Sequence, residues 1–481
     1  MSPPDVIVIG AGFAGLSAAV RLARNGARVL VVEERKRLGG RATAFPDPQS
    51  GEVVDNGQHV LFGCYHETFA FLGAIGAADG VILDSTLDLE ILDRSGRRSR
   101  LHSAPLPPPF HLVVGLLRWP ALGMRDRLAA LRLGRVLRRL HRERQADARA
   151  KARAYVGDAQ ARAWAYVRDG ASADPSYVGP SFSSGIKIGG TVDEWLTAHG
   201  QTPRLHEVLW EPLAVAALNQ SPAVASAAPF IEVLARLFGG SARDAAIGLP
   251  RRPLDHLFAE PARRYLEQHG HAVRCGLPAR VVVDGDRAVA VDLRGERITT
   301  GAVVSSVPWF SFAGVAGHVP ALEPIASAAG QMASSPIVTV NFWLDRRVAT
   351  ASFVGFPGRR FQWMFDKARL FGEQASHVSL VASGADEIVG FSNEALIDLA
   401  RTELSQALPG PWSVIRATAV REKRATFSLA PGQPPRPAPA TPIRQFFLAG
   451  DWTDTGLPAT IESAVLSGHR AADLAAKPCP S

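Results

Sequence analysis

Apolar runs at the start of the chain alternate with glycine-rich and polar turns. Residues 6–9 read VIVI, a continuous β-branched run, which predicts a central parallel strand buried on both faces. Residues 16–25 have the apolar spacing of a helix that ends at a glycine, and residues 28–32 predict a second apolar strand. Strand, turn, helix and strand in this order predict the first unit of a doubly wound α/β fold.

The turn between the first strand and the helix reads GAGFAG and indicates dinucleotide binding. Glycines at this spacing let the chain turn tightly, bring backbone N–H groups against a pyrophosphate, and allow close packing of helix on strand. Glu33 ends the second strand 23 residues after Gly10, where a carboxylate accepts ribose hydroxyls and disfavours a 2′-phosphate. The dinucleotide-binding residues expected from this pattern are Gly10, Gly12, Phe13, Ala14, Gly15 and Glu33.

Arg41 lies shortly after the second strand, in the run LGGRA, where its guanidinium can neutralise a pyrophosphate with two hydrogen bonds. Residues 33–42, EERKRLGGRA, resemble the E-x-R-x-R-x-G-G-R-A segment of the flavin-containing amine oxidase and carotenoid desaturase superfamily. In that superfamily the segment marks FAD. The resemblance therefore implies a retained FAD rather than a dissociable nicotinamide cofactor, with Arg41 among its ligands.

Two remote blocks extend this resemblance. Residues 446–451, FFLAGD, and the run 456–464 that opens a C-terminal helix are similar to the end of the superfamily's chains, where the Gly-Asp carboxylate meets the ribityl group. There the helix N-terminus faces the pyrimidine edge of the flavin or a phosphate. Residues 271–274 resemble the segment whose backbone holds adenine. The FAD contacts implied by these blocks are Val273, Gly450, Asp451, Ala459, Thr460 and Ile461.

The separation of the three blocks predicts the domain organisation. Residues 1–75, 265–305 and 440–481 should together build a Rossmann-like FAD-binding domain from discontinuous segments. Residues 76–264 are expected to be a mostly helical insertion that faces substrate and membrane, and residues 306–439 to carry the strands of the substrate domain. The predicted fold class is thus α/β, with an inserted α+β substrate domain and a helical lid.

Composition narrows the class of protein. A chain of 481 residues with 47% hydrophobic residues predicts two or three domains with sizeable cores. Cys64, Cys275 and Cys479 are too few and too scattered for a disulfide framework or a metal site, so we expect no metal and a reducing cytoplasm. No leader is recognisable and no window is apolar over the length of a bilayer-spanning helix, so no membrane span is expected.

The net charge of +8 is concentrated in residues 118–153, which hold twelve Arg and Lys against three acidic residues. Leucine and valine recur there near helical spacing, so the stretch predicts amphipathic helices with basic faces. Such helices suit an anionic bilayer surface, although a solvated basic face on a lid helix fits the same pattern. The stretch lacks interleaved aromatic residues, which disfavours nucleic acid as a partner. We therefore expect a cytoplasmic protein held peripherally on the inner face of the membrane.

Residues 55–65, DNGQHVLFGCY, indicate the substrate when they are taken with residues 209–219 and 362–366. These runs are similar to those of hydroxysqualene dehydroxylases, FAD proteins of bacterial hopanoid synthesis. The resemblance implies reductive removal of the hydroxyl group of hydroxysqualene to give squalene, a C30 isoprenoid, with isoprenoid synthases of the same pathway as possible partners. It also implies that the first run passes the flavin, through Gly57, Gln58 and His59. His59 either orients flavin or substrate or is a hydrogen-bonded structural histidine.

Loss of an allylic hydroxyl requires a proton donor. The candidate acids are Asp366, Glu211 and Glu462, in addition to His59 as a catalytic residue. Each acid could instead have a purely structural role. Asp366 could pair with Lys367 or Arg369, Glu211 could cap a helix, and Glu462 could stabilise the N-terminus of its own helix.

Three other functions fit the same motifs. A carotenoid or squalene desaturase would take hydride from a polyene rather than give it. An amine oxidase usually needs an aromatic cage, which five tyrosines in the whole chain make less attractive. A flavin-bound membrane scaffold without turnover is the third, and retention of every cofactor motif argues against it.

Overall fold

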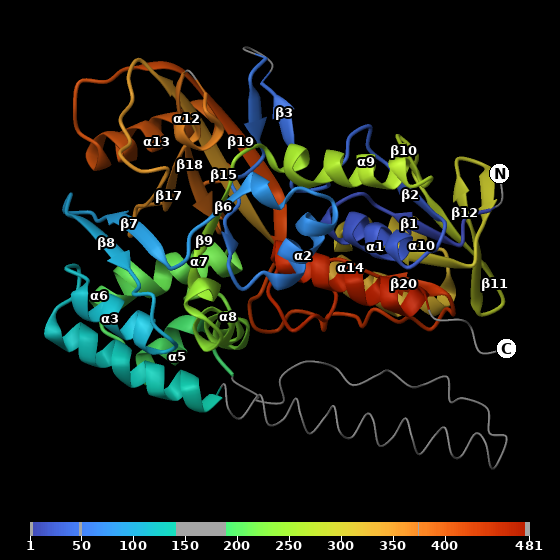
Figure 1. Cartoon of the computed structure of the whole chain (residues 1–481), viewed down its shortest axis with the longest axis horizontal. Coiled ribbons are helices and arrows are strands. Elements are labelled where there is room, and N and C mark those ends of the chain that lie inside the picture. Colours follow the sequence, from blue (N-terminus) through green and yellow to red (C-terminus); the bar gives the residue numbers. More distant parts are fainter. Residues whose placement is uncertain (1–2, 48–50, 141–188, 374, 477–481) are drawn as a thin grey trace.

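The computed structural model describes residues 3–47, 51–140, 189–373 and 375–476 (Figure 1). One layer of the structure is a five-stranded sheet whose strands are all parallel, and we call it the cofactor-side layer because it carries the glycine-rich turn. The order is β10 (Ala272–Cys275), β2 (Val29–Glu33), β1 (Val6–Ile9), β14 (Ala302–Ser305) and β20 (Phe446–Leu448). Strands from three distant parts of the chain therefore form one sheet. The predicted α/β class with a Rossmann-like domain built from discontinuous segments is confirmed.

Two helices, α1 (Phe13–Arg24) and α14 (Ile461–Ala475), pack on this sheet and against each other. Helix α1 begins three residues earlier than the expected residue 16, directly after Gly12. Gly468 allows the contact, because a Cβ atom there would lie 2.2 Å from the carbonyl oxygen of Ala14 and 2.4 Å from Ser17 Oγ. Helix α2 (His66–Ala74) packs on both of these helices, and α9 (Glu260–Gln268) packs on α1.

A second sheet of seven strands forms the opposite layer. Its order is β19 (Val414–Phe427), β15 (Ser334–Leu344), β18 (Ser376–Ser383), β17 (Trp363–Asp366), β16 (Phe353–Gly355), β7 (Asp88–Leu92) and β8 (Arg98–His102). Helix α13 (Asn393–Ala407) packs on one face of it, through a core with Val338, Phe342 and Met364. Because β7 and β8 come from the first predicted insertion and the other strands from the second, the two insertions share this sheet. The boundaries at 76, 264, 305 and 439 stay predictions.

Helices of the first insertion cover the other face of the seven-stranded sheet (Figure 1). They are α3 (Phe110–Arg118), a helix over residues 124–140, α5 (Val192–Ala198), α6 (Pro203–Leu205), α7 (Glu211–Leu218) and α8 (Ala227–Gly239). Within the described ranges, no helix combines the length and apolar character needed to cross a bilayer.

The remaining elements are short. Two small sheets join β5 (Leu61–Phe62), β9 (Ile247–Pro250) and β6 (Val81–Leu83), and β3 (Ala44–Pro46) with β4 (Val53–Asp55). A third, antiparallel sheet holds β11 (Arg280–Asp284), β12 (Arg287–Leu293) and β13 (Glu296–Thr299). Helix α10 (Phe312–Ala316) packs on β11 and on α11 (Glu323–Gln331), whereas α12 (Lys367–Phe371) packs on β17 and β18.

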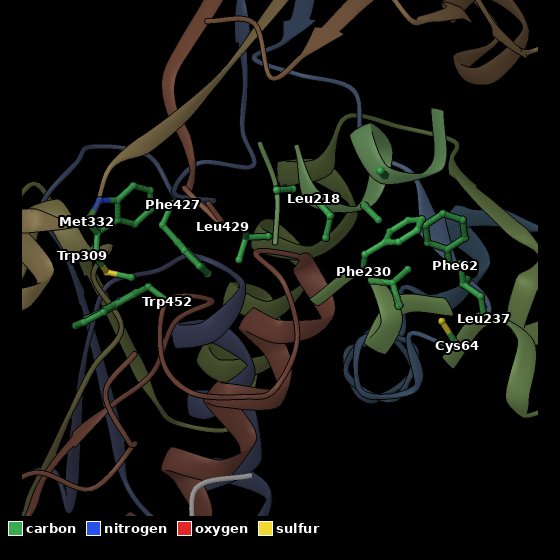
Figure 2. Close-up of a cluster of buried hydrophobic side chains, with 14 of the residues drawn as sticks. Phe62, Cys64, Leu218, Phe230, Leu237, Trp309, Met332, Phe427, Leu429 and Trp452 are labelled. Atoms are coloured by element: carbon green, nitrogen blue, oxygen red, sulfur yellow. The ribbon is translucent and has the colours of Figure 1, made fainter. Parts of the chain in front are cut away.

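One apolar core connects the layers. Figure 2 shows Trp309, Met332, Phe427 and Trp452 on one side, Phe62, Cys64, Phe230 and Leu237 on the other, and Leu218 and Leu429 between them. These side chains come from the N-terminal, middle and C-terminal parts of the sequence, so the helical insertion and the cofactor-side layer are packed as a continuous body.

The α1–α14 contact predicts a specific stability effect. Gly468→Ala should lower the free energy of unfolding by about 1–3 kcal/mol, because a backbone carbonyl cannot move aside as a flexible side chain can. Gly330→Ala in α11 is the matched control: its Cβ atom would meet nothing within 4 Å, and stability should be unchanged or higher by up to about 1 kcal/mol. Urea and thermal unfolding midpoints test this, and equal midpoints for the two variants would contradict it.

Candidate active site

A cavity of about 440 Å³ lies between the carboxyl ends of the parallel strands and the seven-stranded sheet. Ile9 and Glu33, the last residues of β1 and β2, open onto its first part, as expected for ligand binding in a parallel α/β sheet. Its second part is apolar and is walled by strands β7, β8, β16 and β17 and by helices α7 and α8. The cavity thus has a polar dinucleotide end and an apolar arm.

The glycine loop forms the floor of the polar end. Gly10 has a φ of +102°, and Gly12 faces Gly40 so closely that a Cβ atom on Gly40 would lie 3.3 Å from the Gly12 Cα atom. Helix α1 starts here with no side-chain cap and no acidic residue in its first turn, so its N–H groups and dipole are available to an anion. Phe13 and Ala14 line the same wall.

Gly15 has a different role from the other loop glycines. It is not part of the cavity wall that the described residues form, and a Cβ atom there would lie 2.0 Å from the Gly10 carbonyl oxygen and 2.4 Å from Ser306 Oγ. The missing side chain lets α1 pack close to the end of β1. Gly15 therefore supports the geometry of the loop without lining the cavity.

Glu33 lies where the sequence places a ribose-binding carboxylate. Its Oε2 atom accepts a hydrogen bond from the Ala11 N–H at 2.8 Å, and Oε1 accepts one from the Arg35 N–H at 2.9 Å. The carboxylate lines the cavity and is fixed by backbone on both sides. It is thus oriented before any ligand arrives.

Arg41 and Asp451 meet across 410 residues of sequence. Arg41 Nη2 lies 2.5 Å from Asp451 Oδ1, and Arg41 Nη1 donates to the Ala425 carbonyl oxygen at 2.9 Å. Both side chains line the cavity, together with Gly450. The structure thus joins two predicted cofactor residues from opposite ends of the chain.

Gly57, Gln58 and His59 line the cavity where the polar end meets the apolar arm. Burial lowers the pKa of His59 to about 4; the charge of Asp55 opposes this shift and that of Lys367 adds to it. The imidazole is therefore neutral at pH 7. Its Nδ1 atom lies 3.3 Å from the Gly57 carbonyl oxygen.

A buried ion pair behind this segment was missed in the sequence. Lys367 Nζ lies 2.5 Å from Asp55 Oδ2, which also accepts a hydrogen bond from Gln58 Nε2 at 2.6 Å. The side chains of Lys367 and Asp55 are 1% and 6% exposed. Sequence reasoning considered Lys367 as a partner of Asp366, but the lysine instead ties the cofactor-side segment to the seven-stranded sheet.

The N-terminus of α14 forms another wall of the cavity, through Ala459, Thr460 and Ile461. Thr460 Oγ1 caps the helix by accepting the Ser463 N–H at 3.1 Å. Tyr65, which sequence reasoning did not select, lines the cavity beside Thr460. Burial raises its pKa despite a hydrogen bond with Thr460, so the phenol keeps its proton at neutral pH.

Val273 lies in the middle of β10, opposite Val31, where it packs against the core of the cofactor-side layer. Within the described part of the chain, the cavity wall takes Leu277, Pro278 and Ala279 from this block and not Val273. The structure therefore brings to the cavity the residues that follow the predicted adenine segment, rather than the segment itself.

None of the three candidate acids belongs to the cavity wall that the described residues form. Asp366 caps α12 by accepting the Arg369 N–H at 3.1 Å and pairs with the Arg369 guanidinium. Glu462 accepts hydrogen bonds from Thr68 Oγ1 at 2.7 Å and from two backbone N–H groups at the start of α2. These are the structural alternatives considered for both residues, except that Glu462 caps α2 and not its own helix.

Glu211 is the first residue of α7 and is not part of the described cavity wall. Burial raises its pKa, and the charge of Arg94 opposes the shift. The seven-stranded sheet contributes a different carboxylate, Glu422 on β19, to the described cavity wall. Glu422 accepts a hydrogen bond from Asn56 Nδ2 at 3.4 Å. No motif marks Glu422 in the sequence.

Comparison with known proteins agrees with this geometry. The model of the family described as flavin containing amine oxidoreductase matches residues 13–184 and 187–476. A protein of Rhodopseudomonas palustris named hydroxysqualene dehydroxylase is 30% identical over 98% of this chain and 97% of its own length. A 15-cis-phytoene desaturase of Solanum lycopersicum is 23% identical over 97% of this chain and 76% of its own. An oxidoreductase structure from Methanosarcina mazei superimposes with a TM-score of 0.67 at 15% identity, covering 97% and 99% of the two chains.

The polar end fits FAD. The open glycine floor and the uncapped start of α1 suit the pyrophosphate, the fixed Glu33 carboxylate suits a ribose, and the N-terminus of α14 provides a second positive helix end. Arg41 and Asp451 supply charge between these two helices. Bound FAD supplies hydride-transfer chemistry, and the chain supplies its binding and orientation.

We expect Asp451→Asn to lose most of its FAD. The substitution removes the partner of Arg41 and a carboxylate of the cavity wall, and charge-assisted hydrogen bonds of this kind correspond to about a tenfold or greater change in affinity. Bound flavin per protein, and calorimetric titration of apoprotein with FAD, measure the effect. Asp473→Asn, which breaks the exposed Arg21–Asp473 pair at 2.6 Å, is the matched control. Unchanged FAD affinity in Asp451→Asn would contradict the assignment.

His59 predicts a pH dependence of stability. Its folded pKa of about 4 lies below the ordinary 6.5, so between these values the unfolded chain binds a proton that the folded protein does not. The free energy of unfolding of the parent should therefore fall as pH drops from about 6.5 to about 4. The free energy of unfolding of His59→Gln should fall less steeply over the same range. Unfolding midpoints across this range test it, with the exposed His256→Gln as control. Parallel curves for His59→Gln and the parent would refute a buried neutral imidazole.

Proposed function

This chain belongs to the family of flavin-containing amine oxidoreductases and is an FAD-dependent oxidoreductase; we propose that it removes the hydroxyl group of hydroxysqualene to give squalene. The observation that carries the proposal is the apolar arm of the cavity. The names of the relatives that match nearly the whole chain support the same substrate class.

The arm changes in character across the seven-stranded sheet. At the β19 edge the sheet contributes Glu422 and Thr426 to the cavity, whereas at the β7–β8 edge it contributes Leu89 and Leu101. The helices opposite add further apolar side chains, among them Leu209, Leu213, Leu237 and Phe238. Strands β7, β8, β16 and β17 and helices α7 and α8 contribute no ionisable residue to the described wall. A long hydrocarbon suits this arm better than an amine.

The proposed reaction adds a proton and a hydride to the alcohol and yields the hydrocarbon and water. The C–O bond breaks as the hydroxyl leaves as water, and a C–H bond forms at the same allylic carbon. Reduced FAD is the hydride source. The chain's apolar walls exclude water from the carbon that loses its oxygen, which limits return of the alcohol. His59, neutral at pH 7, serves to position flavin or substrate rather than to act as a cationic acid.

A desaturase of carotenoids or squalene is the second candidate, because the same apolar arm accepts a polyene and the phytoene desaturase likeness covers most of the chain. The two reactions differ in the direction of hydride transfer. An amine oxidase fits less well, since the strands and helices that wall the arm contribute no ionisable residue to its described part that could pair with an amine.

We place the activity on the cytoplasmic face of the membrane, where a substrate of this class resides, with an isoprenoid synthase as its supplier. The concentration of arginine in residues 118–153 supports this location.

The direction of hydride transfer tests the proposal. Anaerobic holoprotein with reduced FAD should be reoxidised by hydroxysqualene, with squalene detected by mass spectrometry, and reduction with a deuterated hydride donor should label the product. Ala216→Phe, which fills the arm from a cavity-facing position, should bind FAD normally and form at least about tenfold less squalene. Two results together would favour the desaturase assignment over the dehydroxylase: hydroxysqualene does not reoxidise the reduced protein, and squalene or phytoene reduces the oxidised flavin.

A further inference from the structure

Exposed apolar side chains gather in one short part of the chain. Nine large hydrophobic residues are exposed in the described structure, and five of them lie within residues 106–128: Leu106, Phe110, Leu117, Met124 and Leu128. Phe110 is 59% exposed and Met124 66% exposed. A gathering of this kind on the surface of one chain marks a contact with another molecule or with lipid.

Helical geometry aligns these residues. Phe110 and Leu117 are seven residues apart on α3, and Met124 and Leu128 are four apart on the helix 124–140, so each pair shares a face. The opposite faces are buried, through His111 and Gly115 on α3 and through Ala129, Ala130 and Leu133 on the next helix. We call the exposed side of the two helices the α3 face.

The two helices are held together at the end of the molecule away from β11 and β12 (Figure 1). Only residues 119–123 connect them, and Arg127 Nη2 donates to the Trp119 carbonyl oxygen at 3.3 Å. Their exposed apolar residues therefore cannot separate widely.

The α3 face is also cationic. Arg132 and Arg135 continue the exposed side of the second helix beyond Leu128, and Arg118 and Arg125 flank the connection between the helices. None of these four arginines forms an ion pair with another described residue. The nearby acid Asp126 accepts hydrogen bonds from Thr202 Oγ1 and from the Gly123 N–H. Apolar side chains beside arginines that pair with no described residue complement an anionic bilayer, whose acyl chains can bind the apolar side chains and whose phosphates can bind the arginines.

Helix α3 lies between this face and the β7–β8 strand pair that walls the apolar arm of the cavity. Helix α3 packs on β8 through Gly115, where a Cβ atom would lie 2.9 Å from the His102 carbonyl oxygen. Leu101 on β8 and Leu89 on β7 line the arm. The surface and the arm thus share the β7–β8 strand pair.

We propose that the α3 face is a membrane-docking surface that inserts Phe110, Leu117, Met124 and Leu128 into an anionic bilayer and thereby places the apolar arm next to the lipid that supplies its substrate. The substrate part of this statement rests on the proposed function. Docking itself depends only on the described surface and is measurable without turnover.

The test uses FAD-loaded full-length protein in flotation with vesicles of phosphatidylcholine, with or without phosphatidylglycerol. The parent should float with the anionic vesicles and lose much of this binding at high salt. Phe110→Ser with Met124→Ser should weaken binding at least about tenfold. Arg132→Gln with Arg135→Gln should weaken it about fivefold per arginine on anionic vesicles only.

Two matched controls separate docking from general changes in surface. Phe391→Ser with Ile415→Ser removes exposed apolar residues from another region, and Arg264→Gln with Arg297→Gln removes the same charge elsewhere. Both controls should float like the parent. Flavin content and the thermal midpoint of every variant establish that it is folded.

Three results would overturn the proposal. The parent does not bind anionic vesicles; the α3-face variants bind as well as the controls; or sedimentation shows a dimer that Phe110→Ser dissociates, which would make the face an interface between two copies. Vesicle binding uses no substrate, and squalene formation can be assayed in detergent. Failure of docking and failure of the proposed reaction are therefore distinguishable.

Discussion

Close contact between α1 and α14 is the constraint on which the site depends. Gly468 meets the backbone of Ala14 in the first turn of α1, yet it lies seven residues, about two turns, from the start of α14. The N-termini of both helices consequently open on one cavity, offset along it. In the FAD site that we infer, the start of α1 would serve the pyrophosphate and the start of α14 would lie farther along the same dinucleotide. A bulkier residue at 468 would separate the helices and with them the two halves of the FAD site.

The seven-stranded sheet completes the site from the other side, and a buried ion pair fixes its position. Lys367 leaves the end of β17 and reaches Asp55, which in turn holds Gln58 beside the cavity. An ion pair removed from water is favourable only when its geometry is kept, so breaking either half is costly. The polar edge of the sheet is thereby held at the cofactor, and the apolar β7–β8 edge extends away from it.

Local sequence brought the predicted dinucleotide residues, apart from Gly15 and Val273, to one cavity wall, because glycine spacing and strand ends specify backbone geometry directly. It did not bring the three candidate acids there, because nearness in sequence does not determine which face of an element a residue occupies. On β17, Trp363 and Phe365 face the cavity while Met364 and Asp366 face the opposite way, as a period of two requires. On α7 (Glu211–Leu218), the cavity takes Pro212, Leu213, Ala216 and Ala217 at helical spacing, and Glu211 falls on another side. The Asn56–Glu422 and Lys367–Asp55 contacts join residues 366 and 312 positions apart, which no short motif encodes.

The position of the apolar arm also bears on how a water-insoluble substrate is handled. Its inner end adjoins fixed charges at the dinucleotide, while its outer end is walled by the strand pair that supports α3. A hydrocarbon that crossed open water to reach the arm would first leave an apolar phase, at a cost that grows with its length. Entry from a bilayer held against α3 exchanges one apolar environment for another and avoids that cost. The polar end of the cavity, lined by Glu33, Arg41 and Asp451, lies away from the β7–β8 strand pair, so the charged and apolar parts of the site stay separate.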